Sequence, residues 1–189
     1  MEVKKQIADS IALRKIMLHD ERIESLLIQA IDKIVAVYQN NGKVLLCGNG
    51  GSAADAQHLA AELSGSFYLN RPPLNAEALH VNGSFLTATA NDHSFDQVYS
   101  RMVRAVGHKG DILMAFSTSG KSENVLQALR AARDLSMFTI GFSGSEGTIM
   151  ADYCDILFAI PSSDTPRIQE IHMLLGHIIC EQVELIMYG

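Results

Sequence analysis

Four hydroxyl side chains and a glycine gather in one short segment, residues 117–122 (STSGKS), which we call the hydroxyl loop. Residues 111–116 before it form an apolar run typical of a buried strand, and after Glu123 the apolar residues recur at helical spacing. A strand-to-helix turn leaves backbone N–H groups free at the positive end of the helix dipole. The segment therefore predicts a phosphate-binding loop. The alternative is a helix cap, which would use only one of the four hydroxyls.

A second set of reactive side chains lies on two predicted helices. His58 and Glu62 are four residues apart, so they share one helix face. The last helix carries Gln169 and, in an apolar stretch, His177, whose imidazole is costly to bury without a partner. These four side chains can hold a divalent metal, and the nitrogen ligands favour zinc.

Other interpretations of the same residues stay open. His58 and Glu62 can form an ordinary helix surface contact, and His177 can be a core histidine bonded to a backbone carbonyl. Gln169 and His177 are about 12 Å apart along a helix, so a shared ion requires extended side chains.

Two nucleotide-binding patterns lie nearby, and both are weak. Gly120-Lys121-Ser122 ends like a P-loop, but Ala115 stands where that motif needs glycine. Residues 48–53 (GNGGSA) fit the loose dinucleotide pattern, but residues 64–73 lack the strand ending in an acidic residue that should follow. A dinucleotide site is therefore only a minor alternative.

The positions of these residues follow from alternating strands and helices. Helices are expected over residues 1–40, 53–63, 95–107, from 123 and from 165; strands are expected over 43–47, 76–81, 111–116, 138–142 and 156–160. Residues 86–90 form a second apolar segment after an Asn82-Gly83 turn, with Asn91 and Asp92 at its carboxyl end. This order predicts a mostly parallel sheet of about five strands between helix layers.

Ligands of such sheets bind at the carboxyl ends of the strands. The hydroxyl loop and residues 48–52 (GNGGS), which we call the glycine loop, should therefore share one site. The last helix is apolar nearly all round, so it should be buried, in part against another subunit.

Length and composition limit the class of protein. The chain has 189 residues, 48% of them hydrophobic, which suits a single domain over residues 1–189: a helical segment over 1–40 and an α/β core over 42–189. A net charge of −6 without a basic block argues against nucleic acid as a partner. Three scattered cysteines are typical of a reduced, cytoplasmic protein, and no signal peptide or membrane-spanning run is evident.

Together, these motifs resemble the phosphoheptose isomerases, a group of SIS (sugar isomerase) domain proteins. The resemblance rests on residues 47–52 (CGNGGS), Gln57-His58 with Glu62, Ala90-Asn91-Asp92, residues 117–122, and Arg167 to His172 with His177. It implies a SIS-type three-layer sandwich and an aldose–ketose isomerase that interconverts sedoheptulose 7-phosphate and D-glycero-D-manno-heptose 7-phosphate. It also implies a cytoplasmic homotetramer with active sites at subunit interfaces, one zinc ion per subunit, and a role in heptose supply for lipopolysaccharide or other surface glycans.

The resemblance also implies residue roles. Phosphate-binding positions are Ser117, Thr118, Ser119 and Ser122; further substrate-binding positions are Asn49, Gly50, Gly51, Ser52, Glu62, Asn91, Asp92 and Gln169; the metal ligands are His58, Glu62, Gln169 and His177; and Glu62 and His177 form the acid/base pair. Pro166 departs from the pattern, because some members carry an aspartate there; Asp164 lies two residues earlier. The alternatives are an isomerase of another sugar phosphate and a non-catalytic sugar-phosphate sensor or adaptor.

Overall fold

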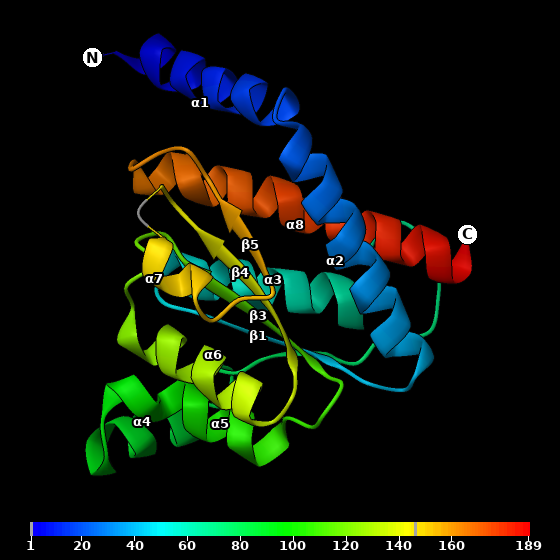
Figure 1. Ribbon diagram of the computed structural model, residues 1–189, viewed down its shortest axis with the longest axis vertical. Coiled ribbons are helices and arrows are strands. Elements are labelled where there is room, and N and C mark those ends of the chain that lie inside the picture. Colours follow the sequence, from blue (N-terminus) through cyan, green and yellow to red (C-terminus); the bar gives the residue numbers. More distant parts are fainter. Residues whose placement is uncertain (1, 146) are drawn as a thin grey trace.

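Five parallel strands form one sheet, in the order β2-β1-β3-β4-β5, with helices on both faces (Figure 1). The computed structural model describes residues 2–145 and 147–189. The elements in chain order are α1 (Val3–Leu18), α2 (Glu21–Gln39), β1 (Val44–Gly48), α3 (Gly51–Ser64), β2 (Ala76–Ala78), α4 (Gly83–Asp92), the 3-10 helix η1 (Phe95–Gln97), α5 (Val98–Val106), β3 (Ile112–Ser117), α6 (Glu123–Asp134), β4 (Phe138–Ser143), α7 (Thr148–Ala151), β5 (Ile156–Ala159) and α8 (Thr165–Tyr188).

The strand order places the two loops side by side. From β1 the chain moves outward to β2 and then returns to the other side of β1 for β3, so the direction of winding reverses between β1 and β3. In open parallel sheets, ligands bind at such a switch point, beyond the carboxyl ends of the strands. Gly48 is in register with Phe116, so the glycine loop and the hydroxyl loop leave the sheet next to each other.

Alternating strand residues supply two buried cores. Leu46 and Met114 face one side of the sheet with α2, α3 and α8, whereas Leu45 and Leu113 face the other side with α5 and α6. Both faces of β1 and β3 are buried, which explains why these strands are continuous apolar runs rather than alternating ones. The predicted three-layer α/β sandwich is confirmed, and its sheet is wholly parallel.

The N-terminal helical prediction resolves into two helices. Asp20 begins α2 by accepting a hydrogen bond from the Arg22 N–H, which separates α2 from α1. The helix ends at Gln39, and Asn41 follows with a φ of 60°, as the Asn40-Asn41-Gly42 stop signal predicts.

The last helix, α8, buries one side within the chain. Ile171, Leu175 and Ile179 are buried there, but Leu185 and Ile186 are 43% and 55% exposed. Its burial against another subunit stays a prediction. Among the described residues, no helix combines the length and the apolar character that a membrane crossing requires.

One predicted segment is wrong. Asn82 does not make a turn between two extended segments; its side chain accepts the Phe85 N–H and begins helix α4. The spacing of Leu86 and Ala90 matches one helix face, and both pack on the core beside α5. Strand β2 covers only Ala76–Ala78 and is shorter than the predicted strand over residues 76–81. Asn91 and Asp92 therefore end a helix and do not lie at the carboxyl end of a strand.

Candidate active site

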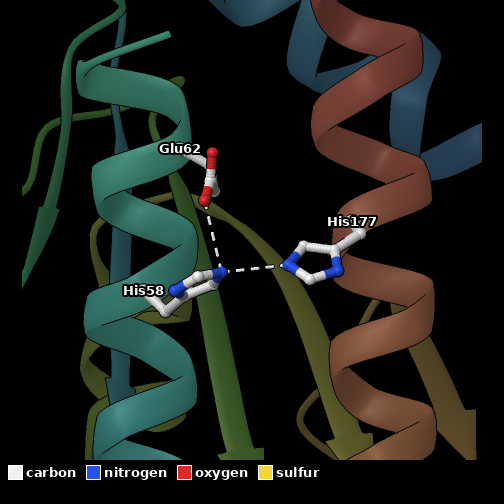
Figure 2. Close-up of side chains that lie close together, drawn as sticks. All are labelled: His58, Glu62 and His177. Atoms are coloured by element: carbon white, nitrogen blue, oxygen red, sulfur yellow. Dashed lines mark hydrogen bonds and ion pairs between the residues drawn. The ribbon is translucent and has the colours of Figure 1, made fainter. Parts of the chain in front are cut away.

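Three ionisable side chains meet between α3 and α8. His58 and Glu62 extend from α3 and His177 extends toward them from α8 (Figure 2). The His58 Nε2 atom is 3.0 Å from His177 Nε2 and 3.2 Å from Glu62 Oε1. A glycine beside His177 permits this approach: a Cβ atom on Gly176 would lie 2.5 Å from the Leu59 side chain. The helices can therefore pack closely where the three side chains project.

The geometry of this group fits a metal ion. One ligand atom from each of His58, Glu62 and His177 lies within 4.8 Å of the others. A tetrahedral zinc site with bonds of about 2.0–2.1 Å has edges of about 3.3 Å, close to the two separations around His58 Nε2. Two Nε2 atoms 3.0 Å apart cannot both point a proton at each other, so at least one offers a lone pair. The donor set suits zinc.

Gln169 lies in the first half of α8. A Cβ atom added to Gly51 would overlap its side-chain amide, so a larger residue at position 51 would require the flexible Gln169 side chain to move. Gln169 and His177, eight residues apart on α8, both line a cavity of about 510 Å³. The other residues around this cavity are Arg14, Asp55, Pro166, Glu170, Met173 and Leu174.

The hydroxyl loop leads from β3 into α6 without a side-chain cap. Ser122 occupies the N-cap position of α6, but its side chain makes no capping bond and instead accepts a hydrogen bond from the Ser117 hydroxyl at 3.0 Å. Gly120 has a φ of 65°, and a Cβ atom there would strike Gly147, so the turn requires glycine. The loop follows the carboxyl end of β3 and precedes the first turn of α6, a position where an anion binds favourably.

Further hydroxyls line the same region. A cavity of about 120 Å³ is bounded by Thr118, Ser119, Ser145, Ser162, Ser163 and Thr165. Backbone bonds hold its walls together, from Gly144 N–H to the Thr118 carbonyl and from Ser145 N–H to the Ser162 carbonyl. The four hydroxyls beyond the hydroxyl loop are absent from the sequence prediction. The Ser162-Ser163 pair after a predicted strand is a signal that could have identified part of this wall.

The glycine loop is bonded to the helix that follows the hydroxyl loop. The side-chain amides of Asn49 and Asn124 exchange hydrogen bonds of 2.8 and 2.9 Å. The Tyr99 hydroxyl also donates to the Gly48 carbonyl, which anchors the glycine loop to α5. Asn124 is buried in the first turn of α6, and nothing in its local sequence marks it as a partner of the glycine loop.

Two predicted positions are less closely tied to the site. Asn91 and Asp92 are exposed and bond to each other at 2.8 Å. Within the described residues, no hydrogen bond connects either of them to the glycine or hydroxyl loop. Pro166 lines the cavity of about 510 Å³, whereas Asp164 occupies the N-cap position of α8 without a side-chain capping bond.

The surroundings affect two other titratable groups. Burial raises the pKa of Asp55 to about 6, against a lowering by the nearby His58, and its Oδ2 atom is buried without a hydrogen-bond partner in the described chain. Burial lowers the pKa of His172 to about 4, and its Nε2 atom lies 3.3 Å from the Ser143 carbonyl. His172, rather than His177, is thus the core histidine. Sequence reasoning missed Asp55, although it lies one turn before His58.

Comparisons with known proteins agree with this architecture. Residues 8–144 match the SIS domain family model. The phosphoheptose isomerase of Burkholderia pseudomallei is 46% identical over 99% of this chain and 95% of its own length, and that of Helicobacter pylori is 45% identical over 96% and 93%.

Solved structures give the same relationship. Phosphoheptose isomerase from Neisseria gonorrhoeae superposes with a TM-score of 0.90 at 40% identity, and that from Francisella tularensis with 0.93 at 34% identity, each over 97% of both chains. The chain therefore belongs to the SIS domain family, within its group of phosphoheptose isomerases.

Proposed function

We propose that this protein is an aldose–ketose isomerase that interconverts sedoheptulose 7-phosphate and D-glycero-D-manno-heptose 7-phosphate. The observation that carries the proposal is the group His58, Glu62 and His177, which meets between α3 and α8 (Figure 2). The hydroxyl loop supports it as a candidate for phosphate binding. A protein that only binds sugar phosphates needs the loop but not a proton-transfer pair. The named activity of the relatives supports the choice of sugar.

The phosphate would be held by local dipoles, since the chain carries a net negative charge. The ligands in this proposal are the hydroxyls of Ser117, Thr118, Ser119 and Ser122, together with N–H groups at the start of α6. The sugar would contact Asn49, Gly50, Gly51, Ser52, Glu62, Asn91, Asp92 and Gln169. Phosphate binding at one end fixes the sugar, so that C1 and C2 face the ionisable group.

Isomerisation requires a base that moves a proton between C1 and C2 and a group that serves the two oxygens. We assign the carbon proton to Glu62 and the oxygen protons to His177. The His58 Nε2 atom contacts both of these side chains, so Glu62 and His177 approach the substrate from two helices. His58 engages one oxygen of Glu62, which leaves the second oxygen for proton transfer.

A zinc ion would be held by His58, Glu62, Gln169 and His177, one ion per subunit. Bound there, zinc polarises the sugar carbonyl and stabilises negative charge on its oxygen. The protein itself orients the ligands, since α3 and α8 are packed closely at Gly176.

We further propose a cytoplasmic homotetramer, built from a single domain over residues 1–189, that supplies heptose for lipopolysaccharide or other surface glycans. Free cysteines support a reducing compartment. Exposed large apolar side chains support an assembly; they are Val3, Ile7, Ile11, Ile16, Leu18, Ile28, Leu185 and Ile186 on α1, α2 and α8.

The test combines an isomerisation assay with calorimetric titration of sugar phosphates. Seven-, six- and five-carbon sugar phosphates are compared, and the seven-carbon pair should give the highest kcat/KM. Glu62→Gln and His177→Gln should lose turnover and still bind the substrate, because the hydroxyl loop is unchanged. Glu77→Gln, at an exposed residue of strand β2, is the matched control. Wild-type protein that binds sugar phosphates when zinc-loaded but converts none of them would overturn the proposal in favour of a sensor or adaptor.

A further inference from the structure

A buried ion pair connects the two helices that carry the ionisable group. Arg71 lies in the connection between α3 and β2, and Glu184 lies on α8, about two turns beyond His177. The Arg71 Nε atom donates to Glu184 Oε2 at 2.7 Å, and each side chain is only 1% exposed. Compared with apolar residues of similar volume, a buried ion pair contributes little net stability, so packing alone does not explain this one.

Arg71 fixes the end of α3. Its guanidinium donates from Nη2 to the Glu62 carbonyl and from Nη1 to the Leu63 carbonyl, both at 2.9 Å. These carbonyls lie in the last turn of the helix, where they have no intrahelical partner. Arg71 therefore holds the backbone of the residue proposed as the base.

Glu184 fixes the connection that follows α3. Its carboxylate accepts the N–H groups of Phe67 at 2.8 Å and of Tyr68 and Leu69 at 2.6 Å each. Burial would raise the pKa of this carboxyl, but these bonds and Arg71 lower it to about 2. The carboxylate is thus charged at neutral pH, and three successive residues are bound to α8.

Phe67 transmits this constraint to the site. The centroid of its ring lies 5.7 Å from that of His177, with the planes tilted by 47°, and His58 meets His177 edge-on at 5.2 Å. The orientation of the His177 ring is therefore limited by two neighbours, and one of them is held by Glu184 through its own backbone N–H.

We propose that the Arg71–Glu184 pair is a positioning element of this site, which sets the orientation of the His177 ring and the place of Glu62 relative to it. The proposal rests on the function proposed above. Groups that orient metal ligands change metal affinity or activity by about 10- to 100-fold when they are replaced. A displacement of about 1 Å has a similar effect on rate.

The test uses Glu184→Gln, Arg71→Lys and Phe67→Leu, with Asp111→Asn as the control. Asp111 matches Glu184 in kind: it is 4% exposed, pairs with Lys43 at 2.8 Å and accepts the N–H groups of Lys43 and His108, but it lies at the amino ends of the strands. The readouts are kcat, KM, thermal stability, and zinc affinity measured by competition with a chelating dye.

We expect the three positioning variants to lose about 10- to 100-fold in kcat and in zinc affinity. KM should stay within about twofold of the wild-type value, because the hydroxyl loop is unchanged. Asp111→Asn should be less stable than wild type, but its kcat and zinc affinity should be unchanged. Should Glu184→Gln and Arg71→Lys not fold, Phe67→Leu carries the test, since it leaves the ion pair intact.

The proposal is overturned if the variants fold and have a lowered melting temperature, as Asp111→Asn does, but keep wild-type kcat and zinc affinity. The pair would then serve stability alone. The zinc affinity is measured by dye competition and does not depend on enzymatic turnover. If wild-type protein isomerises no sugar phosphate, the proposed function fails, and the zinc titrations still decide whether the pair positions His177.

Discussion

Asn49 and Asn124 exchange two amide hydrogen bonds across the switch point of the sheet, 75 residues apart in the chain. One amide belongs to the loop after β1 and the other to the helix after β3. Each amide donates one hydrogen bond to the other and accepts one from it. The pair therefore fixes the distance between the glycine loop and the helix start that follows the hydroxyl loop. A substrate held by phosphate at one loop and by sugar at the other depends on that distance.

Replacing Asn124 by alanine should therefore affect both stability and binding. Loss of the two bonds leaves the half-buried Asn49 amide without its partner, which should cost about 1–3 kcal/mol in the free energy of unfolding. KM should rise several-fold, and a double-mutant cycle with Asn49→Ala should show non-additive changes in both quantities. Gln127→Ala, which removes a 2.7 Å bond to Glu123 on the same helix, is the control. An unchanged KM in Asn124→Ala would restrict the pair to a role in stability.

The second prediction concerns the hydroxyl loop. Ser119→Ala and Ser122→Ala should each raise KM with a smaller change in kcat, because binding lost at the phosphate is common to ground state and transition state. Each lost bond to a charged phosphate should cost about 1.5–3 kcal/mol. The control is Asp20→Ala, which removes a true N-cap of α2 and should lower stability alone. A wild-type KM in both serine variants would argue that no phosphate binds there.

The third prediction concerns the metal. Zinc added to metal-free protein should bind at one ion per chain and raise the melting temperature, by an amount equivalent to about 2.7 kcal/mol at a free concentration of 100 times Kd. His58→Gln should abolish this rise, and Gln169→Ala should weaken it if the amide is the fourth ligand. His108→Gln, at an exposed histidine, should leave the rise intact. Equal zinc affinity in Gln169→Ala and wild type would remove Gln169 from the ligand set.

The strand–loop–helix units after β1 and β3 could be predicted because their signals are local: an apolar run, a glycine- or serine-rich turn and helical periodicity. Helix α4 could not. Asn82-Gly83 is equally compatible with a turn between strands and with a helix start. Packing of Leu86 and Ala90 on the α5 side of the sheet decides between them, and this packing is not visible in the local sequence.

Within the site, sequence spacing identifies His58 with Glu62, but the partners from distant segments require the fold. His177 lies 119 residues from His58, and Arg71 lies 113 residues from Glu184. Arg71 also follows a stretch of Gly, Ser and aromatic residues that is indistinguishable from an ordinary surface connection. A buried ion pair arises only when the connection returns to α8.

The fourth prediction is a pH dependence of stability. Burial lowers the pKa of His172 from 6.5 to about 4, so between these values the unfolded chain binds a proton that the folded chain does not. Stability should fall as the pH drops through this window, with about 3 kcal/mol lost below pH 4. His172→Gln keeps a donor for the Ser143 carbonyl and removes the titration, so its unfolding free energy should fall less between pH 6.5 and 4. Parallel curves for the two proteins would contradict the assignment.

The last prediction separates two chemical routes for the isomerisation. If Glu62 transfers the carbon proton through an ene-diolate, substrate recovered from heavy water before full conversion should carry solvent deuterium at the exchanging carbon. Glu62→Gln should abolish this exchange, whereas Ser122→Ala should retain it at saturating substrate, since that variant loses binding and keeps the base. The measurement is mass spectrometry of substrate and product with time, on variants whose zinc content has been matched. Conversion by wild-type protein without any incorporation would indicate a direct hydride shift between C1 and C2, and the carboxylate would then have no role as a base.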